Sequence, residues 1–384
     1  MKKPILTVDV IFTLIIVLAI CVLAIIPTGF DTYVTPNSIR TIAKIEAVDN
    51  SMVYTTGSFI NLGTQLCDVK VIWGPFKGST VTARNDLTGR LDFDKFFAPG
   101  EKALAVVEYS QDQQIRYVTL IDHFRINVEI ILFGLFMLLL ILFARWTGVK
   151  AIVSFILTIL SIWKILIPYT LRGANPIVVS LILVTFLTIV VLLLVGGLNR
   201  KSVAAILGSL SGTILTCILA LIFSRSFNIH GAVLPFSESL LYAGYAHLNL
   251  TNILISVIFI GSAGALMDLA MDISASVYEV VQSKPDISTE DAIKSGLNVG
   301  KAVVGTMTTT LLFAYTGGFL GLLMVFMAQG TPIVDILNLR YVSKEIMQTI
   351  IGSFGLVTVS PFTAIISGLL FTKKGTDHSI ATDD

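Results

Sequence analysis

Two aspartates, Asp268 and Asp272, stand at the end of a long apolar run near residues 251–271. Their spacing places both carboxylates on one face of a helix. An ionised side chain costs roughly 2.5–3.5 kcal/mol at the centre of a bilayer, and less near its edge. Two like charges in so poor a solvent are expected to hold a cation, or one of them to hold a proton. The pair is therefore a candidate for ion or proton coupling. The alternative readings are a solvated residue at the membrane boundary for Asp272 and a structural role for Asp268.

The next apolar run supplies hydroxyl groups that suit the same chemistry. We expect Asp268 to face the protein interior close to these hydroxyls, and Asp272 to be the entry or release position for the ion. Hydroxyl oxygens facing the carboxylates would act as ligands or as a proton path. The side chains in question are Thr306, Thr308, Thr309 and Thr310.

A second tier of candidates consists of Glu279, Gly264, Ser276 and Pro361. Glu279 follows the aspartates and is read either as part of the site or as a solvated residue. Pro361, in the last apolar run, should kink its helix, and broken helices are common at transporter sites. Small residues such as Gly264 let helices approach closely, so packing is the alternative reading for them.

Ser288 opens a capping-box-like sequence that predicts a short interfacial helix before the threonine-bearing run.

The composition indicates an integral membrane protein. Of the 384 residues, 54% are hydrophobic and only 13% are charged, and the mean hydropathy is +0.86. A net charge of +1 gives no reason to expect a nucleic-acid partner. The three cysteines lack metal-ligand spacing, and we find no nucleophile–base constellation. We therefore expect no enzyme activity, no cofactor and no metal centre.

Eight apolar runs are long enough to cross a bilayer. The excess of Lys and Arg on one side of these runs predicts that both termini are cytoplasmic. The expected domains are an N-terminal anchor at 1–27, an extracytoplasmic β-domain at 28–126, a seven-helix membrane domain at 127–371 and a cytoplasmic tail at 372–384. The runs lie near 8–27, 127–145, 151–170, 177–197, 203–224, 251–271, 303–327 and 347–371.

Residues 39–121 have a different character from the rest of the chain. Five stretches rich in Val, Ile, Thr and Tyr partly alternate between apolar and polar residues, and Gly and Pro separate them. Five short strands without an intervening helix predict a small closed barrel, similar to an OB-fold. The segment lacks a basic face, which favours a docking module over a nucleic-acid binder. The predicted strands are Ile39–Ala47, Thr64–Trp73, Ser79–Ala83, Ala103–Tyr109 and Arg116–Ile121.

The chain resembles the YibE/F family of multi-spanning bacterial membrane proteins over nearly its whole length. The resemblance rests on the N-terminal anchor, the β-domain sequence Val71–Gly78 and the seven-span core. Its most specific part is the segment from Gly264 through Asp268 and Asp272 to Ser276. This resemblance implies a bacterial cell-membrane protein and little chemistry.

A shorter stretch, residues 264–323, is similar in order to the SecD/SecF and resistance–nodulation–division pattern. There a membrane Asp precedes a cytoplasmic Glu, a short amphipathic helix and a span that opens with threonines. In that superfamily such helices use the proton gradient to move an outward domain. The resemblance assigns Asp272 and Glu279 to the acidic positions, and Thr308–Thr310 to the threonines. The shorter link, the different span count and the small outward domain depart from the pattern.

Two functions of different classes follow from the sequence. The first is a secondary transporter, or a proton- or cation-coupled device, that acts on an unknown small solute or ion. The second is a non-transporting scaffold or assembly factor whose β-domain docks an envelope protein. The carboxylates favour the first function. An outward domain without an obvious ligand site favours the second.

Overall fold

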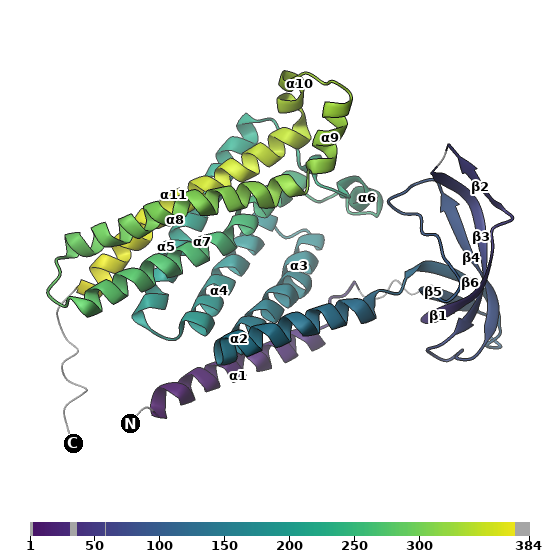
Figure 1. Ribbon diagram of the computed structural model, residues 1–384, viewed down its shortest axis with the longest axis horizontal. Helices are drawn as coiled ribbons and strands as arrows, with labels where there is room; N and C mark the ends of the chain where they lie inside the picture. The colour runs from purple at the N-terminus through teal and green to yellow at the C-terminus, as the bar shows by residue number, and fades with distance from the viewer. Residues whose placement is uncertain (1–2, 31–36, 58, 373–384) are drawn as a thin grey trace. The chain divides into compact units, whose positions relative to one another are not determined.

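The computed structural model describes residues 3–30, 37–57 and 59–372. The chain divides into two compact units, one formed by residues 1–29 and 143–384 and the other by residues 30–142. Figure 1 follows the chain through both units, from a helix at the N-terminus through six strands to the remaining helices. Each unit is described by itself below.

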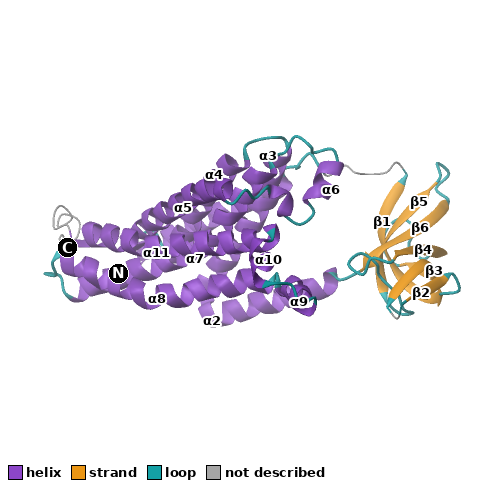
Figure 2. Cartoon of the chain, turned by 90° about the horizontal axis from the view of Figure 1, so that it is seen from above, coloured by secondary structure: helices purple, strands orange, loops and turns teal. Residues whose placement is uncertain are grey.

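The second unit contains the five predicted strands and one that was not predicted. The additional strand, β2, is short and pairs with the start of β3 in a hairpin. Figure 2 shows the strands gathered in one body of sheet. The six strands are β1 (Ser38–Asp49), β2 (Val53–Thr56), β3 (Ile60–Val71), β4 (Thr80–Thr88), β5 (Lys102–Tyr109) and β6 (Ile115–His123).

The strands close into a small barrel because β1 pairs with both β5 and β3. The circuit is completed through β3–β4, β4–β6 and β5–β6, and β4–β6 is its parallel pair. Along β4 and β5, buried residues alternate with partly or fully exposed ones, as a sheet with one covered face requires. The buried side chains, among them Ile45, Val69 and Phe97, form one apolar core. The prediction of a small β-barrel is confirmed.

The first unit is helical. Its central bundle consists of the long helices α5, α7, α8 and α11, with α4 packed beside α7. The helices are α1 (Lys3–Ile25), α2 (Ile126–Ser161, shared with the second unit), α3 (Ile167–Leu171), α4 (Pro176–Gly196), α5 (Arg200–Ser226), α6 (Ser237–Tyr242), α7 (Leu250–Ser283), α8 (Thr289–Gly317), α9 (Leu320–Ala328), α10 (Ile333–Asn338) and α11 (Arg340–Thr372), with a π-helical turn η1 (Ile162–Leu166) and a 3₁₀ turn η2 (Gly231–Val233).

Among the described residues, six helices are long and apolar enough to cross a membrane, or seven if α8 and α9 form one broken span. The sequence predicts eight spans, and the difference arises in α2. The runs at 127–145 and 151–170 belong to one helical stretch of 46 residues, Ile126–Leu171. At Arg145 the backbone leaves the helical region, with φ 50° and ψ −123°, so this stretch consists of two helical segments.

Two other predictions about helices need adjustment. Ser288 caps α8, since its Oγ accepts a hydrogen bond from the Asp291 N–H at 3.1 Å, as the capping-box sequence predicts. However, the expected short interfacial helix and the following span form one continuous helix, which ends at Gly317 and bends by 66° into α9. The helix in this part of the chain is therefore interrupted at the bend between α8 and α9, and it is continuous from Thr289 to Gly317.

Small residues allow the bundle helices to cross closely. A Cβ atom at Gly300 of α8 would lie 1.7 Å from Oγ of Ser360 in α11. At Gly355 of α11, a Cβ would lie 2.3 Å from Oγ1 of Thr216 in α5. Neither position has room for a larger side chain, so these glycines are packing residues. Close packing fixes the rotation of α7, α8 and α11, and thus decides which faces remain uncovered.

Candidate functional site

An acidic stripe runs along the uncovered face of α7. We define the stripe as Gly261, Gly264, Asp268 and Asp272, all of which are exposed in the chain. The opposite face of α7 carries the fully buried Leu266, Leu269, Ala270 and Ile273, which belong to the bundle core. The stripe therefore faces away from the packed interior of this chain. This location differs from the sequence expectation that Asp268 points into the protein.

The start of α5, which follows the end of α4, gives a reference level for the positions of the two aspartates along α7. Ser274 Oγ of α7 donates a hydrogen bond to the carbonyl of Lys201 at 2.8 Å, and Lys201 Nζ lies 5.1 Å from the ring centroid of Tyr278. Because a helix rises about 1.5 Å per residue, Asp272 lies about 3 Å and Asp268 about 9 Å from the level of Ser274. Asp272 is thus close to the level of Ser274 and Lys201, and Asp268 lies about one helical turn further from it along α7.

The carboxylates of Asp268 and Asp272 form no hydrogen bond or ion pair with a residue in the described part of the chain. Ser276, one turn further, donates to the backbone carbonyl of Asp272 at 2.8 Å, which leaves the carboxylate unused. A Cβ at Gly264 would meet no heavy atom within 4 Å. Glu279 is exposed beyond Tyr278, in keeping with its solvated reading. The stripe therefore has open space beside its deeper carboxylate.

The threonines of α8 are divided between two faces. Thr308 and Thr309 line a groove of about 410 Å³ together with residues of α11, among them Thr349 and Ser353. Thr306 and Thr310 are exposed. Each of the four hydroxyls donates to a backbone carbonyl three or four positions earlier. The hydroxyls of Thr308 and Thr309 are thus associated with α11, whereas the sequence analysis expects them opposite the α7 aspartates. Their role as ligands stays a prediction.

Pro361 lies inside α11, which continues through it to Thr372. Its neighbour Ser360 is buried against Gly300 at the crossing with α8. The surroundings of Pro361 are therefore a helix crossing, and whether the proline has a mechanical role stays a prediction.

An ion pair between a buried lysine and a partly exposed aspartate lies where α1 meets α2, and sequence reasoning did not find it. Lys150 Nζ lies 2.9 Å from Asp9 Oδ2, and Lys150 is only 6% exposed. The pair lines a pocket of about 610 Å³ that also contains Lys201 and Tyr278. Met271 of α7, which is next to Asp272, reaches the same region, since a Cβ at Gly196 would lie 2.2 Å from its Cε. The available signal was Asp9 itself, a carboxylate within an apolar run.

A polar cluster lies at the other end of the stripe and was also missed. A Cβ at Gly261 would lie 2.8 Å from Tyr315 Oη and 3.5 Å from Gln348 Nε2. Tyr315 Oη and Gln348 Oε1 are buried, Tyr315 interacts with the Gln348 side chain, and Gln348 is 5% exposed. One turn away along α11, Lys344 and Glu345 form a largely buried ion pair. Polar groups thus lie at both ends of the stripe.

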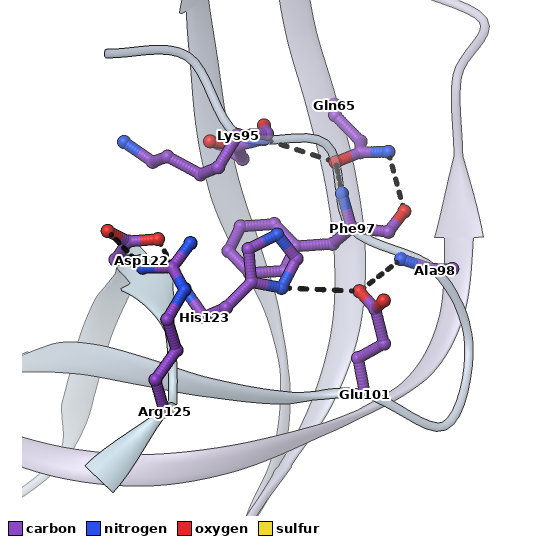
Figure 3. Close-up of polar contacts among 9 residues, drawn as sticks. Gln65, Lys95, Phe97, Ala98, Glu101, Asp122, His123 and Arg125 are labelled. Atoms are coloured by element: carbon purple, nitrogen blue, oxygen red, sulfur yellow. Dashed lines mark hydrogen bonds and ion pairs between the residues drawn. The ribbon is translucent and has the colours of Figure 1, made fainter. Parts of the chain in front are cut away.

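The barrel contains a separate buried network that holds the Gly89–Glu101 loop over one barrel end (Figure 3). Gln65 Nε2 donates to the Phe97 carbonyl at 3.0 Å, and the Phe97 N–H donates to Gln65 Oε1 at 3.0 Å. Asn85 Nδ2 donates to Gln65 Oε1 at 3.1 Å and to the Lys95 carbonyl at 2.7 Å. The Phe97 side chain, 1% exposed, fills the barrel beneath the loop. These hydrogen bonds hold the Gly89–Glu101 loop against the end of the barrel.

Charged groups at the same barrel end are tied to their neighbours. Arg125 donates a hydrogen bond to Asp122 and, together with the His123 N–H, lowers the pKa of that carboxyl. His123 Nδ1 lies 3.4 Å from Glu101 Oε2. Burial raises the pKa of the Cys67 thiol in the barrel core to about 11. No group of three or more metal-ligating side chains is found among the described residues.

The comparisons concern the helical part of the chain. A family model described as YibE/F-like protein matches residues 132–373, which is more than half of the sequence. Searches of curated proteins and of solved structures found no match. The matched region contains the acidic stripe, the threonines of α8 and the polar cluster of α11, and it begins after the barrel. The chain therefore belongs to the YibE/F-like protein family.

Proposed function

We propose that this protein is a proton- or cation-coupled membrane device, with Asp268 and Asp272 as its coupling carboxylates. The observation that carries the proposal is the uncovered acidic stripe of α7. In the most apolar stretch of α7, 56% of the residues are buried in the chain. The same helix nevertheless carries two carboxylates and two glycines on its exposed face. Such a face is unsuited to hydrocarbon, since an ionised aspartate there costs several kcal/mol.

The chemistry of the pair follows from its spacing. Two carboxylates one turn apart repel each other, and the apolar surroundings of Asp268 disfavour its ionised form. A proton on Asp268, or a cation shared with Asp272, removes both penalties. Protonation or cation binding would then favour a state in which the stripe is covered, and release would favour a hydrated state. Asp272, near the level of Ser274 and Lys201, is the exchange position for the ion.

The polar groups on either side extend this site into a path. Tyr315 and Gln348 lie beside Gly261, about 10 Å along α7 from Asp268. On the other side, Met271, the neighbour of Asp272 in the sequence, lies against Gly196, which lines the Asp9–Lys150 pocket. Buried hydroxyl and amide groups are suited to transient hydrogen bonds with water. An ion or proton would therefore pass from the Tyr315 region along the glycines to Asp268 and Asp272.

The second candidate function is a scaffold that docks an envelope protein through the barrel. The strand circuit β1–β3–β4–β6–β5, with its single parallel pair, supports an OB-like barrel as the docking module. We further propose a bacterial cell-membrane location with both termini cytoplasmic, on the strength of the Lys and Arg distribution. We also propose that the transported species is a small solute or ion and that the protein has no enzyme activity.

Thermal unfolding of the purified protein tests the coupling proposal. Ligand binding to the folded state raises the unfolding midpoint, so the midpoint should respond to pH or to added Na⁺, K⁺ or Mg²⁺. Asp268→Asn should abolish the response to an added cation and weaken the response to pH while the protein still folds, because the amide keeps the size and polarity of the side chain. Glu279→Gln, a charge change at an exposed position of the same helix, is the matched control and should retain it. An unchanged response in Asp268→Asn and Asp272→Asn would contradict the coupling role and favour the scaffold.

A further inference from the structure

One end of the barrel is joined directly to α2. Strands β4 and β6 are parallel, with Ala83 opposite Val118, so the C-terminal ends of both lie at the same barrel end. β6 ends at His123 and α2 begins at Ile126, a link that spans no more than about 10 Å. β4 leads into the Gly89–Glu101 loop. This loop and the start of α2 therefore occupy the same end of the barrel.

The loop presents large apolar side chains to the outside. Leu91 is 67% exposed, Phe93 53% and Phe96 45%, whereas the next residue, Phe97, is buried in the barrel. We call Leu91, Phe93 and Phe96 the apolar collar. The guanidinium of Arg90 lies 4.3 Å from the centroid of the Phe93 ring, so a basic group accompanies the collar. Three large exposed apolar side chains within six residues of one loop indicate an interaction surface.

The collar is held in a defined position. Besides the Gln65 contacts to Phe97, the Asp94 carboxylate accepts hydrogen bonds from the N–H groups of Thr88 and Gly89 at 2.9 and 2.6 Å. The rings of Phe97 and His123 lie with centroids 4.6 Å apart, which connects the loop to the last residue of β6 (Figure 3). The collar and the start of α2 are thus parts of one anchored structure.

We propose that the apolar collar inserts into the interfacial layer of the bilayer that α2 enters. The first turn of α2 mixes the exposed Ile126 and Val128 with Asn127 and Glu129. From Ile130 to Phe143 the helix is apolar on all sides, with Ile130 and Ile131 exposed, as expected for a helix surrounded by lipid. The hydrocarbon layer would therefore begin about one helical turn, roughly 6 Å, beyond the short link that joins α2 to the barrel end. Phe and Leu side chains next to a basic group are suited to the boundary between lipid headgroups and acyl chains. The collar would orient the barrel upright on the membrane and shield its loop end from water.

Site-directed spin labelling of the full chain in lipid nanodiscs tests the proposal. Cys21→Ser and Cys217→Ala remove two thiols, while the fully buried Cys67 is retained because its raised pKa makes it unreactive. A nitroxide at Phe93→Cys should collide more with oxygen, which concentrates in lipid, than with a water-soluble nickel chelate. The control is Lys77→Cys in the exposed turn between β3 and β4, at the opposite barrel end. It should show the reverse preference.

Each other outcome would overturn the proposal. Equal access of the nickel chelate at both positions would mean that the collar faces water. Low access of both reagents at Phe93→Cys would mean that protein covers the collar, either another part of this chain or a second copy. A nitroxide at Leu91→Cys should behave as the one at Phe93→Cys does, which guards against a local effect of replacing one ring.

Discussion

Replacement of Gln65 by leucine should open the barrel end that carries the apolar collar. Gln65 is fully buried and supplies the side-chain partners of both the N–H and the carbonyl of Phe97. Gln65→Leu would leave these two backbone groups without those hydrogen bonds. An orphaned buried polar group costs about 1–3 kcal/mol, and the added apolar burial returns part of that, so we expect a loss of about 2–4 kcal/mol.

The thiol of Cys67 measures this loss within the intact chain. Cys67 is fully buried on β3, so it reacts with a thiol reagent only when the barrel opens. When reclosing is faster than the reaction, the labelling rate follows the opening equilibrium. A tenfold change corresponds to about 1.4 kcal/mol, so Gln65→Leu should label roughly 30- to 700-fold faster than the parent that lacks Cys21 and Cys217.

A control variant separates this effect from general softening of the sheet. Thr64 Oγ1 donates to Asp86 Oδ1 at 2.7 Å on the barrel surface. Thr64→Val should change the Cys67 labelling rate by no more than about threefold, as is usual for surface substitutions. Equal labelling rates for Gln65→Leu and the parent would refute the assigned role of the Gln65 network.

Two further predictions concern the barrel and the topology. Burial alone would raise the pKa of Asp94, but the hydrogen bonds from Thr88, Gly89 and Arg90 outweigh it and lower that pKa; its ionised form therefore stabilises the barrel above about pH 4, and this stability is lost as the pH falls through the lowered pKa. The difference in opening free energy between the parent and Asp94→Asn should shrink between about pH 6 and pH 3, measured by labelling Cys67 with an acid-active disulfide reagent, and a constant difference would contradict this reading. A single cysteine at Ser79 should react with an impermeant thiol reagent in intact cells while one at Ser379, which lies outside the described residues, should be protected; the reverse pattern would overturn the proposed orientation.

The barrel could be predicted from the sequence because one face of each strand is buried. In stretches such as Ile39–Ala47, alternation of apolar and polar residues follows from that burial and from the two-residue period of a strand. The strand Val53–Thr56 was missed because it is too short to establish a period, and it is an extension of the β3 hairpin. The barrel therefore followed from local pattern, and its additional edge strand did not.

The candidate site could be predicted from the sequence only in part. The spacing of Asp268 and Asp272 predicted a shared helix face, which the structure contains, because that relation depends on helix geometry alone. Whether that face is covered depends on the rotation of α7 against its neighbours, which the close crossings at glycines determine. The pair Asp9–Lys150 joins residues 141 positions apart, and no local pattern predicts such a contact. Local geometry was thus predictable, and tertiary apposition was not.

Charge displacement on a solid-supported membrane tests the coupling role of the carboxylates most directly, since it needs no knowledge of the transported substrate. Proteoliposomes containing the wild-type chain are exposed to a rapid step in pH, or in Na⁺ concentration at constant ionic strength. Binding of an ion at Asp268, about 9 Å along α7 from the level of Ser274, should produce a transient current. The current should disappear in Asp268→Asn and persist in Glu279→Gln. A wild-type current that Asp268→Asn retains in full, or no current from the folded wild-type protein at any step, would contradict the account.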